Sequence, residues 1–468
     1  MKKKLLMTAM VAALGGVGTA QAVHVNSDGL GQVLIYPYYT VQNGFDSYIN
    51  LVNTTNQVKA VKVRFLEGKN SQEVLDFNLY LSPNDEWSGA IVKTDTGAKL
   101  VSSDTSCIAP AQIPAAGQDF RNLKYATDSV SSLARTREGY VEVIEMGVVT
   151  DGASATAATH VNGVPADCAL VRTNAKTGGR FNTAKATNGI ALPSGGLYGF
   201  VTLINVNSGL KTTVDAIAVD NFYQGALVTD DLHFPPGDTN PSLEAVDTVG
   251  EIIDGATLVT YSSAKAIDNL SAVLTRAMIA NDYSIDAGRQ SKTDWVITFP
   301  TKRFYVNTVT PKPFTQVWDK TKSLSCDEIS IVYYDREERR HLVTIDEDFS
   351  PKPDVVASKN SLCNEVNTLS IKPFASTATY STLFGAEFTN ASFTVEDSNF
   401  NAGWLNISFA NTLPGTVNAL PGSLVGLPVV GFAGLSNTNG TLSVGGVNVL
   451  SNYLGSSVHK GERLRTVP

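Results

Sequence analysis

Few residue patterns in this chain match those that carry enzyme chemistry. Its five histidines are scattered, at His24, His160, His233, His341 and His459. No H-E-x-x-H motif occurs, and no two histidines are close enough in sequence to share a face, so no histidine-based metal site is expected. The G-x-S-x-G turn of many hydrolases and the glycine-rich phosphate loops are also absent from the sequence.

One catalytic pattern does occur. Ser262-Ser263-Ala264-Lys265 satisfies the S-x-x-K motif of penicillin-binding enzymes. In those enzymes a K-T-G follows downstream on a strand, whereas here Lys176-Thr177-Gly178 lies upstream in a loop-like stretch. We therefore interpret Ser262 or Ser263 as the N-cap of a helix.

Carboxylates are densest in the run Asp335-Arg336-Glu337-Glu338-Arg339-Arg340, with Asp346-Glu347-Asp348 just beyond it. Paired carboxylates about 5 to 10 Å apart serve glycosidases, and loop carboxylates bind calcium through about six to eight oxygens. Neither a D-x-D-x-D-G loop nor a calcium-binding repeat is present. We interpret the run as a solvated hairpin with cross-strand ion pairs, and we expect no catalytic residue, no metal ligand and no cofactor.

Four cysteines remain, Cys107, Cys168, Cys326 and Cys363. No C-x-x-C occurs and no histidine lies at ligand spacing, which argues against zinc. An even number of cysteines in an exported protein indicates disulfides. Three connectivities are open, and we favour the sequential one because each bridge would then staple one loop-rich excursion.

Aromatic residues offer a different chemistry, stacking on a sugar ring. Tyr36, Tyr38 and Tyr39 are concentrated around Pro37, while the four tryptophans are spread along the chain. Many aromatics alternate with polar residues, as core residues of strands do, so Tyr36, Tyr38 and Tyr39 are only an alternative site for contact with a glycan.

The elements that would position these residues are mostly strands. Residues 75–81 and 61–65 alternate apolar and polar side chains and flank a Gly/Asn/Ser segment, which predicts a β-hairpin. Further predicted strands are residues 33–39, 47–52, 140–146, 198–204, 214–219, 295–299, 329–334, 404–409 and 427–432. Pro428 favours an edge position for the last of these. The expected fold class is all-β, with antiparallel β-sandwich units of Ig-like or jelly-roll-like type, long loops and one or two short inserted helices.

Two segments are expected to be helical. Residues 263–280 place Ile267, Leu270, Leu274 and Met278 on one stripe, which predicts an amphipathic helix packed on a sheet. A shorter helix is expected within residues 129–137. Small and polar residues dominate 97–117 and 151–196, which we interpret as long loops.

The expected domain organisation has three parts. A signal peptide covers residues 1–22, and an N-terminal sandwich-like domain with long loop insertions covers residues 23–235. A C-terminal β-rich domain covers residues 242–468, and the Pro/Gly-rich residues 233–241 form the linker. A weak internal similarity links residues 48–53, 200–205 and, more loosely, 404–409; it indicates either duplicated units or simply the usual form of a half-buried strand.

Export is the best supported functional feature. Lys2, Lys3 and Lys4 precede a short apolar run, and Ala20-Gln21-Ala22 is a typical cleavage site that would leave Val23 first. The run is shorter than the about 20 residues that cross a bilayer, so no transmembrane span is expected. Removal of residues 1–22 leaves 33 basic and 44 acidic residues, a net charge of about −11. An acidic chain without Lys/Arg clusters excludes nucleic acid as a partner.

The sequence resembles a family of exported proteobacterial proteins known only as cell-surface proteins. The motifs that carry the resemblance are residues 31–40, 53–55, 61–68, 75–83, 139–147, 293–303 and 334–338, and they span nearly the whole mature chain. The resemblance implies a Gram-negative envelope and a location at the cell surface, outside the cell or in the periplasm. It implies no enzyme class and no site residues.

Two functions are therefore in competition. The first is a secreted or surface-exposed structural or adhesive β-protein without catalytic activity, which binds copies of itself or other envelope proteins. Its N-terminal strand, with Val33, Ile35, Tyr36 and Tyr38, either completes a neighbour's sheet or pairs within its own domain. The second is an extracellular carbohydrate-binding protein or glycoside hydrolase.

Overall fold

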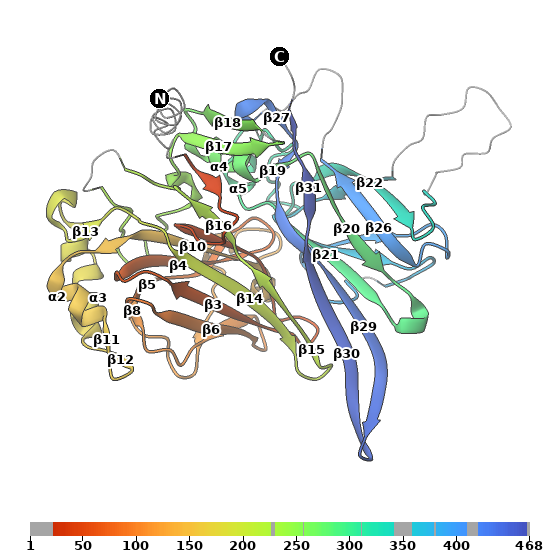
Figure 1. Cartoon of the computed structure of the whole chain (residues 1–468), viewed down its shortest axis with the longest axis horizontal. Helices are drawn as coiled ribbons and strands as arrows, with labels where there is room; N and C mark the ends of the chain where they lie inside the picture. The colour runs from red at the N-terminus through yellow and green to blue at the C-terminus, as the bar shows by residue number, and fades with distance from the viewer. Residues whose placement is uncertain are drawn as a thin grey trace, which may run out of the picture.

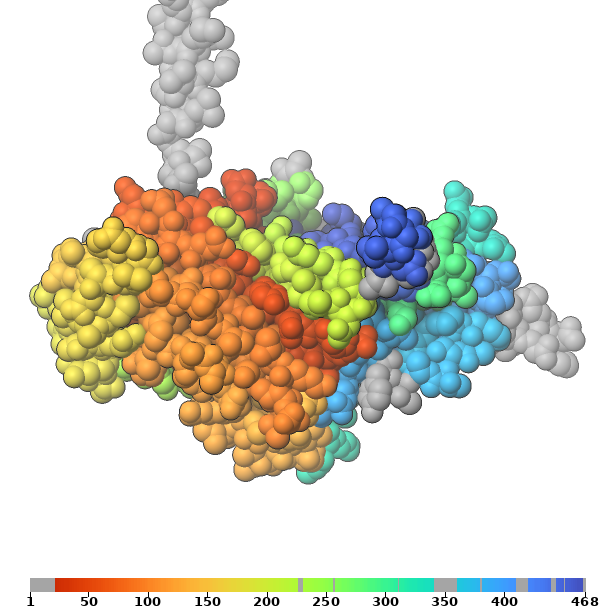
Figure 2. All heavy atoms as spheres, turned by 90° about the horizontal axis from the view of Figure 1, so that it is seen from below, coloured from red at the N-terminus to blue at the C-terminus, as the bar shows by residue number. Residues whose placement is uncertain are grey.

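Two β-sandwiches lie side by side in the chain (Figures 1 and 2). The computed structural model describes residues 22–225, 230–255, 257–309, 311–340, 358–378, 381–409 and 420–465. The segment expected to be a signal peptide (except Ala22), His341 and the run Asp346-Glu347-Asp348 lie outside the described residues. The expected all-β class with antiparallel sandwich sheets is confirmed.

The first sandwich is built from residues 24–220. Its sheet I runs in the order β1 (His24–Val25), β16 (Ile217–Asp220), β2 (Val33–Thr40), β10 (Glu138–Val149), β4 (Lys59–Glu67), β5 (Glu73–Leu81) and β8 (Cys107–Ala109), with β13 (Ile190–Ala191) added on β10. Its sheet II runs in the order β15 (Leu210–Asp215), β14 (Leu197–Asn205), β3 (Asp46–Asn53), β6 (Glu86–Lys93), β7 (Ala98–Val101) and β9 (Gln118–Asp119). The two sheets meet in an apolar core, where the rings of Phe77 and Trp87 lie 5.7 Å apart.

The second sandwich is built from residues 278–462. Its sheet I runs in the order β31 (Lys460–Glu462), β20 (Met278–Ser284), β26 (Ala402–Ser408), β22 (Asp327–Asp335) and β23 (Ser358–Leu362). Its sheet II runs in the order β30 (Val447–Val458), β29 (Val430–Val444), β21 (Lys292–Thr298), β24 (Val366–Lys372) and β25 (Asn390–Thr394).

The two sandwiches have one topology. In chain order, β2, β3, β4, β5, β6, β7, β10, β14, β15 and β16 of the first correspond to β20, β21, β22, β23, β24, β25, β26, β29, β30 and β31 of the second. Both the sheet in which each strand lies and its neighbours agree. The one difference is that β25 runs parallel to β24, whereas β7 is antiparallel to β6. We call the two sandwiches the first and second repeat.

Side chains support this correspondence. In the first repeat the Ser47 hydroxyl accepts the Thr40 N–H at 2.9 Å and donates to the Thr40 carbonyl at 2.7 Å. In the second, the Thr293 hydroxyl bonds the Ser284 N–H and carbonyl in the same way, at 2.9 and 2.8 Å. Each pair ties the end of the first strand to the start of the second, where the chain crosses between sheets.

The strand register agrees as well. Gly139 lies opposite Glu67 and Tyr39, and in the same way Gly403 lies opposite Asp335 and Tyr283. The G-F-x-x-L-x-N segments at 199–205 and 431–437 also match in register, since their glycines lie opposite Leu51 and Ile297, which correspond. The internal similarity noticed in the sequence is a different one: β3 and β14 are neighbours in one sheet, and β26 corresponds to β10.

Segments outside the shared core distinguish the repeats. Between β10 and β14 the first repeat carries α2 (Gly152–Ala158), the short hairpin β11 (His160–Val161) and β12 (Val164–Pro165), and α3 (Cys168–Ala175). This insert lies at the end far from the second repeat (Figure 1). Between the repeats lie the hairpin of β17 (Val249–Asp254) and β18 (Thr257–Ser262) and the helix α4 (Ala266–Leu274). The remaining short elements are α5 (Arg303–Val306), β19 (Thr275–Arg276), β27 (Leu424–Val425), β28 (Leu427–Pro428) and β32 (Leu464–Arg465).

Several expected boundaries are wrong. The helix expected over 263–280 ends at Leu274, because Ile279 and Tyr283 alternate into the core as part of β20. Its N-cap is Lys265, not Ser262 or Ser263; the Ser263 hydroxyl instead donates to Asp268 at 3.0 Å.

Other segments also differ from expectation. The strand expected over 214–219 is two strands with a break at Ala216. Within 129–137 only a 3-10 turn forms, at Leu133–Arg137. The expected linker 233–241 packs on sheet I of the first repeat, where the Asn78 side chain donates to the Phe234 carbonyl at 2.9 Å. The domain boundary that we drew there stays a prediction.

Candidate functional site

The densest group of buried charges lies where the second repeat packs on the first. We call this contact the joint: it joins sheet I of the first repeat, on the face turned away from its sheet II, to residues 298–307, 363–367 and 381–389. Every residue of β4 and β10 is buried. The second repeat covers one part of the face that would otherwise meet water, and residues 194–195 and 232–238 cover the other part. Hydrogen bonds to backbone carbonyls cross the joint. The Val366 N–H donates to the Gly68 carbonyl at 2.8 Å, and the Thr298 hydroxyl donates to the Pro37 carbonyl at 2.6 Å.

Glu138 holds one side of the joint. This fully buried carboxylate accepts the N–H groups of Glu387 and Phe388 at 2.7 and 3.0 Å, and the Thr389 hydroxyl donates to it as well. Burial raises the pKa of Glu138 in spite of these donors. Beside it the ring of Phe384 lies 5.6 Å from that of Tyr38. A carboxylate of the first repeat thus fixes a backbone segment of the second.

Glu142 is the centre of the joint. Arg64, on the neighbouring strand, reaches it at 2.9 Å, and Arg303, from the second repeat, reaches both of its oxygens at 3.3 Å. The Tyr140 hydroxyl donates to the same carboxylate at 3.1 Å. Arg64 also binds Glu73 at 2.8 Å. One fully buried carboxylate therefore balances two arginines that come from different repeats.

Glu67 and Glu365 lie on either side of one turn. Glu67 accepts the N–H groups of Lys69 and Gln72 at 2.7 and 3.0 Å, and Arg135 binds it at 2.5 and 2.7 Å. Burial opposes ionisation of Glu67, but Arg135 and these donors outweigh it, and its pKa is lowered. Glu365, in contrast, has its pKa raised well above the usual value by burial, against the opposing charge of Arg303. The Ser71 hydroxyl donates to Glu365.

The joint has residue types found in acid–base sites, but solvent and substrate do not reach its carboxylates. Glu67, Glu138 and Glu142 are fully buried and Glu365 is 1 % exposed. Each binds arginine, hydroxyl or backbone donors of the protein itself. What such a buried cluster can do is hold the two packed sheets in one relative position.

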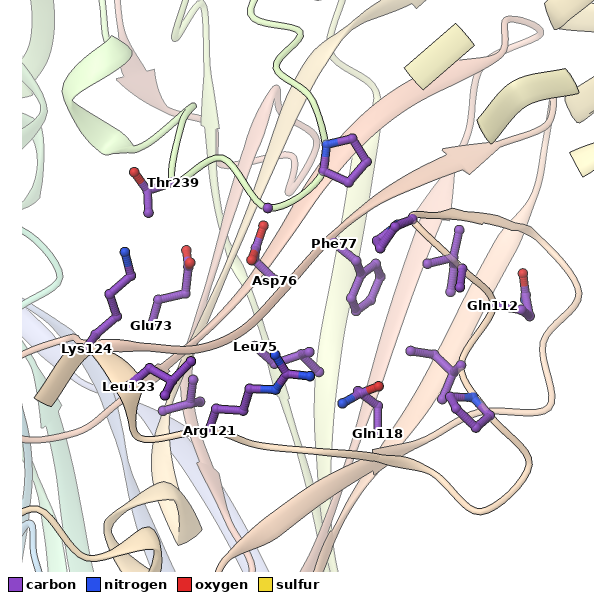
Figure 3. A pocket seen from close by; sticks show the side chains of 18 residues that line it. Glu73, Leu75, Asp76, Phe77, Gln112, Gln118, Arg121, Leu123, Lys124 and Thr239 are labelled. Carbon is purple, nitrogen blue, oxygen red and sulfur yellow. The ribbon is translucent and has the colours of Figure 1, made fainter. Parts of the chain in front are cut away.

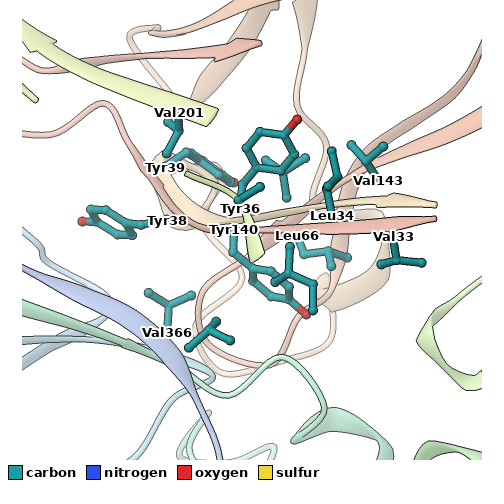
Figure 4. Packing of buried hydrophobic residues seen from close by; sticks show 14 of the residues in the cluster. Val33, Leu34, Tyr36, Tyr38, Tyr39, Leu66, Tyr140, Val143, Val201 and Val366 are labelled. Carbon is teal, nitrogen blue, oxygen red and sulfur yellow. The ribbon is translucent and has the colours of Figure 1, made fainter. Parts of the chain in front are cut away.

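The aromatic cluster named as an alternative site for contact with a glycan lies in the core, so that alternative is wrong. Tyr36, Tyr38 and Tyr39 are all fully buried. Tyr36 and Tyr38 project from opposite faces of β2, with Val201 on the Tyr36 side and Val366 on the Tyr38 side (Figure 4). The Tyr36 hydroxyl donates to the Asn50 carbonyl at 2.7 Å. No ring face of the three remains open for stacking, because sheet II covers one side and the second repeat the other.

The N-terminal strand pairs within its own chain. β2 lies between β16 and β10, and Ile35 has antiparallel partners on both sides, Ile217 and Glu142. Val33, Ile35, Tyr36 and Tyr38 are fully buried. Of the two alternatives left open for this strand, the structure of the single chain contains the internal one, and the strand offers no free edge to a neighbour.

The cysteines form two disulfides, Cys107–Cys168 and Cys326–Cys363. The sequential connectivity that we favoured is confirmed. The first bridge ties α3 to the edge strand β8, and the second joins the residues just before β22 and just after β23. Both lie at the same edge of sheet I in their repeats.

The described histidines do not converge. His233 is buried, with its Nε2 2.8 Å from the Tyr80 hydroxyl and its Nδ1 3.0 Å from the Asn182 side chain. His459 lies 3.0 Å from the Val296 carbonyl and packs on Trp295. Burial lowers the pKa of His233 to about 3 and that of His459 to about 4.

The carboxylate run 335–340 forms a turn, as expected for a hairpin. Asp335 is buried and accepts the N–H groups of Glu337 and Arg339 at 3.0 and 2.8 Å. Arg339 also forms ion pairs with Asp335 and Glu337. Asp335 therefore shapes the backbone of the turn.

One open cavity has carboxylates on its wall (Figure 3). It measures about 430 Å³ and lies between β5, residues 108–124 and residues 236–239. Its lining is mostly apolar, from Val74, Leu75, Phe77, Ile108, Ile113 and three prolines. Glu73 and Asp76 project on one side of it, and each already has a cation, Arg64 or Lys62. Burial raises the pKa of Glu73. This size and lining suit a small-molecule site.

Sequence reasoning missed the joint. Lys62 and Arg64 are the polar residues of the alternating run 61–65, yet they are buried and paired with Asp76 and Glu142. The signal that was available is complementarity: a basic strand at 59–64 and an acidic strand at 138–145. Opposite charges on two strands that also alternate apolar residues indicate strand neighbours with a covered face.

Among the described residues no group of three or more His, Cys, Asp or Glu side chains is placed to hold a metal ion. Within the same ranges, no helix has the length and apolar character needed to cross a membrane. No protein-family model, no curated protein and no solved structure matches the chain.

Proposed function

We propose that the chain is an exported structural protein of a bacterial envelope or of its surroundings, which acts by contact with other molecules and not by catalysis. The observation that carries the proposal is the joint. Its carboxylates and arginines are the groups best suited to catalysis, yet they bind each other and the backbone and so hold the two sandwiches in one orientation. A rigid double sandwich is useful to a protein whose work is to present surfaces.

Two further features support this proposal. The disulfides suit an oxidising compartment outside the cytoplasm. The N-terminal Lys-rich and apolar pattern with its Ala-x-Ala site has the form of an export signal, and the resemblance to exported cell-surface proteins points to the same compartment.

The test is a fractionation experiment with the full chain. The gene is expressed in a Gram-negative host, and the protein in cytoplasm, periplasm, membranes and medium is quantified and its N-terminus sequenced. We expect a mature chain that starts at Val23 and lies outside the cytoplasm, together with no turnover in a broad hydrolase screen. Cytoplasmic retention of the uncleaved chain, or turnover of any substrate, would refute the proposal.

The cavity beside β5 favours a second candidate, an extracellular carbohydrate-binding protein or glycoside hydrolase. Glu73 has the raised pKa of a general acid, and Asp76 projects on the same side. A second feature is the ring of Trp404, which is 41 % exposed on the face of sheet I in the second repeat. A glycan array and a glycosidase screen on the wild type, Glu73→Gln and Trp404→Ala test it. Binding or hydrolysis lost in either variant supports this candidate, and a blank array excludes it.

A further inference from the structure

The hairpin of β29 and β30 is longer than its counterpart in the first repeat. There, β14 ends at Asn205 and the chain returns as β15 from Leu210. In the second repeat the corresponding Asn437 is followed by further ladder pairs up to Val444 and Val447, around a Gly445-Gly446 turn. We call residues 438–452 the arm. Figure 1 shows that it projects beyond both sandwiches.

The arm is an addition to a scaffold that folds without it. The first repeat closes the same two strands with a short turn and retains the same sheet order. A projecting extension therefore costs conformational entropy that the sandwich does not require. Such an extension is expected where it makes a contact outside the fold.

The arm and the segments around it carry no charge. Residues 398–459 contain no Asp, Glu, Lys or Arg, although the chain as a whole has 80 such residues and a net charge of −8. Exposed edge strands usually carry lysines or other charges, which prevent pairing with further chains. β30 is such an edge strand, and it has none of these protections.

One face of the arm is apolar and uncovered. Val444 and Val447 lie opposite each other, with Val449 and Tyr453 on the same face of β30. Their side chains are 59, 65, 45 and 64 % exposed, respectively. Val444, Val447 and Val449 form an apolar surface at the tip of the hairpin, and Tyr453 lies on the same face nearer the base, beyond Ser451.

This face continues the core side of sheet II. Ser457 of β30 lies opposite Ala433, which lies opposite Trp295. The Trp295 side chain points to sheet I, where its Nε1 donates to the Asp282 carbonyl at 3.1 Å. Since side chains alternate along a strand, Tyr453 projects to the same side as Ser457. Among the described residues no strand lies opposite this face of the arm, so the arm extends sheet II alone.

The base of the arm is fixed. The Asn452 side chain donates to the Ser208 carbonyl at 2.7 Å, and the Ser456 hydroxyl donates to the Thr213 carbonyl at 2.9 Å. The edge strands β15 and β30, which correspond in the two repeats, therefore lie side by side. A surface held in this way loses little entropy on binding.

We propose that the arm is a self-association surface, whose apolar face packs on the arm of a second copy of the chain about a two-fold axis. The proposal rests on the proposed function, since it names the partner of a contact protein. A second copy fits for two reasons. Copies that share a negative charge repel each other except through neutral surface, and the arm is neutral. A single apolar face also complements itself in a two-fold contact.

The experiment measures mass in solution by light scattering and sedimentation, on the full mature chain. The wild type is expected to be dimeric. Val447→Lys with Val449→Lys places charges on two exposed positions of the arm and is expected to give a monomer with an unchanged melting temperature. Leu258→Lys, on the equally exposed β18 of the hairpin between the repeats, is the matched control and is expected to stay dimeric.

A charge swap tests whether arm meets arm. Val447→Glu with Val449→Glu is expected to be monomeric alone, and to form a mixed dimer with the lysine variant because opposite charges then face each other. A wild type that is monomeric at every concentration overturns the proposal, as does a dimer that Leu258→Lys breaks and the arm variant does not. Failure of the mixed variants to pair also overturns it.

Lipid is the other occupant that the experiment addresses. Vesicles of phosphatidylethanolamine and phosphatidylglycerol are sedimented with the wild type and with the lysine variant. A monomeric wild type that binds vesicles through its arm replaces the proposal with a membrane contact. None of these outcomes changes where the protein is located or whether it turns over a substrate, so the arm can fail while the proposed function stands.

Discussion

Glu67 and Asp335 occupy the same position in the two repeats and do the same work. Each ends its strand opposite a glycine, and each accepts backbone N–H groups of the turn that follows: Lys69 and Gln72 for Glu67, Glu337 and Arg339 for Asp335. Their surroundings differ, because the turn after Glu67 lies in the joint and the turn after Asp335 is exposed. The same carboxylate-capped turn thus occurs in both repeats, but only in the first repeat does it form part of the contact between them.

The glycines opposite these carboxylates should be required in both repeats. A Cβ at Gly139 would lie 1.9 Å from the Leu66 carbonyl oxygen, and one at Gly403 would lie 1.9 Å from that of Tyr334. Gly139→Ala and Gly403→Ala must each displace a strand, and we expect each to lower the free energy of unfolding by about 1 to 3 kcal/mol. Gly455→Ala is the control, since its Cβ meets nothing within 4 Å. Urea unfolding measures all three, and equal effects at Gly403 and Gly455 would contradict the correspondence.

Two carboxylates of the joint should respond in opposite ways to loss of charge. Glu142→Gln removes the anion that pairs with Arg303 and leaves Arg64 with Glu73 alone, so we expect it to cost about 3 kcal/mol of unfolding free energy. In Glu365 burial raises the pKa above its unfolded value, so its ionisation opposes folding as the pH rises. Glu365→Gln should therefore keep or raise the stability at pH 7. Urea unfolding measures the stability of both variants. A large loss of unfolding free energy in Glu365→Gln would mean that the Glu365 carboxylate is charged and paired, which would contradict the prediction.

How far the sequence predicts this structure depends on the kind of signal. Alternation located most strands correctly, since a period of two depends only on one buried face. It could not show that Lys62 and Arg64 are buried, because residues far along the chain cover them: Asp238 contacts Lys62, and Arg303 shares Glu142 with Arg64. Met278 fits the spacing of a helical stripe, but residues 278–284 form a strand because they pair with β26, and Ile279 and Tyr283 then face the core.

Duplicated units were left open from the sequence, but on segments that do not correspond, for a related reason. Residues 48–53 and 200–205 look alike because both are half-buried strands of one sheet. The segments that correspond, 199–205 and 431–437, share only Gly, Phe, Leu and Asn at matched positions. Their equivalence becomes clear when Gly199 and Gly431 are seen opposite Leu51 and Ile297. The similarity between the repeats is evident from the strand register, which cannot be read from the sequence.

Buried histidines should make the protein less stable in mild acid. Burial lowers the pKa of His233 to about 3 and of His459 to about 4, below the about 6.5 of an unfolded chain. Between these values the unfolded state binds more protons, so stability falls as the pH drops below about 6.5. Carboxylates with raised pKa, such as Glu365, act in the opposite direction, so single variants are needed.

His459→Gln isolates one of these groups. The amide can replace the contacts with Asn281 and Val296, but it does not titrate. We expect the slope of melting temperature against pH between 6.5 and 4 to become shallower than in the wild type, even where the variant is less stable at pH 7. His24→Gln, at a half-buried histidine near the N-terminus, serves as the control. Parallel slopes for the wild type and His459→Gln would contradict the assignment.

The two disulfides should differ in what they stabilise. Cys107–Cys168 spans 61 residues and Cys326–Cys363 spans 37, so loop closure alone would give each about 4 kcal/mol. The first, however, attaches an insert that the second repeat does not contain, together with the contact of Arg172 to the Ile108 carbonyl at 2.8 Å. The second closes the ends of β22 and β23 within the shared core.

Removal of each bridge separates these roles. Cys107→Ser with Cys168→Ser should expose residues 152–189 to limited proteolysis, while the main calorimetric transition moves little. Cys326→Ser with Cys363→Ser should lower that main transition, because the sheet itself loses its closure. Calorimetry and mass spectrometry of tryptic fragments measure both. If the first double variant instead unfolds as a whole, the insert belongs to the cooperative core of the first repeat, and the fold shared by the two repeats does not stand without it.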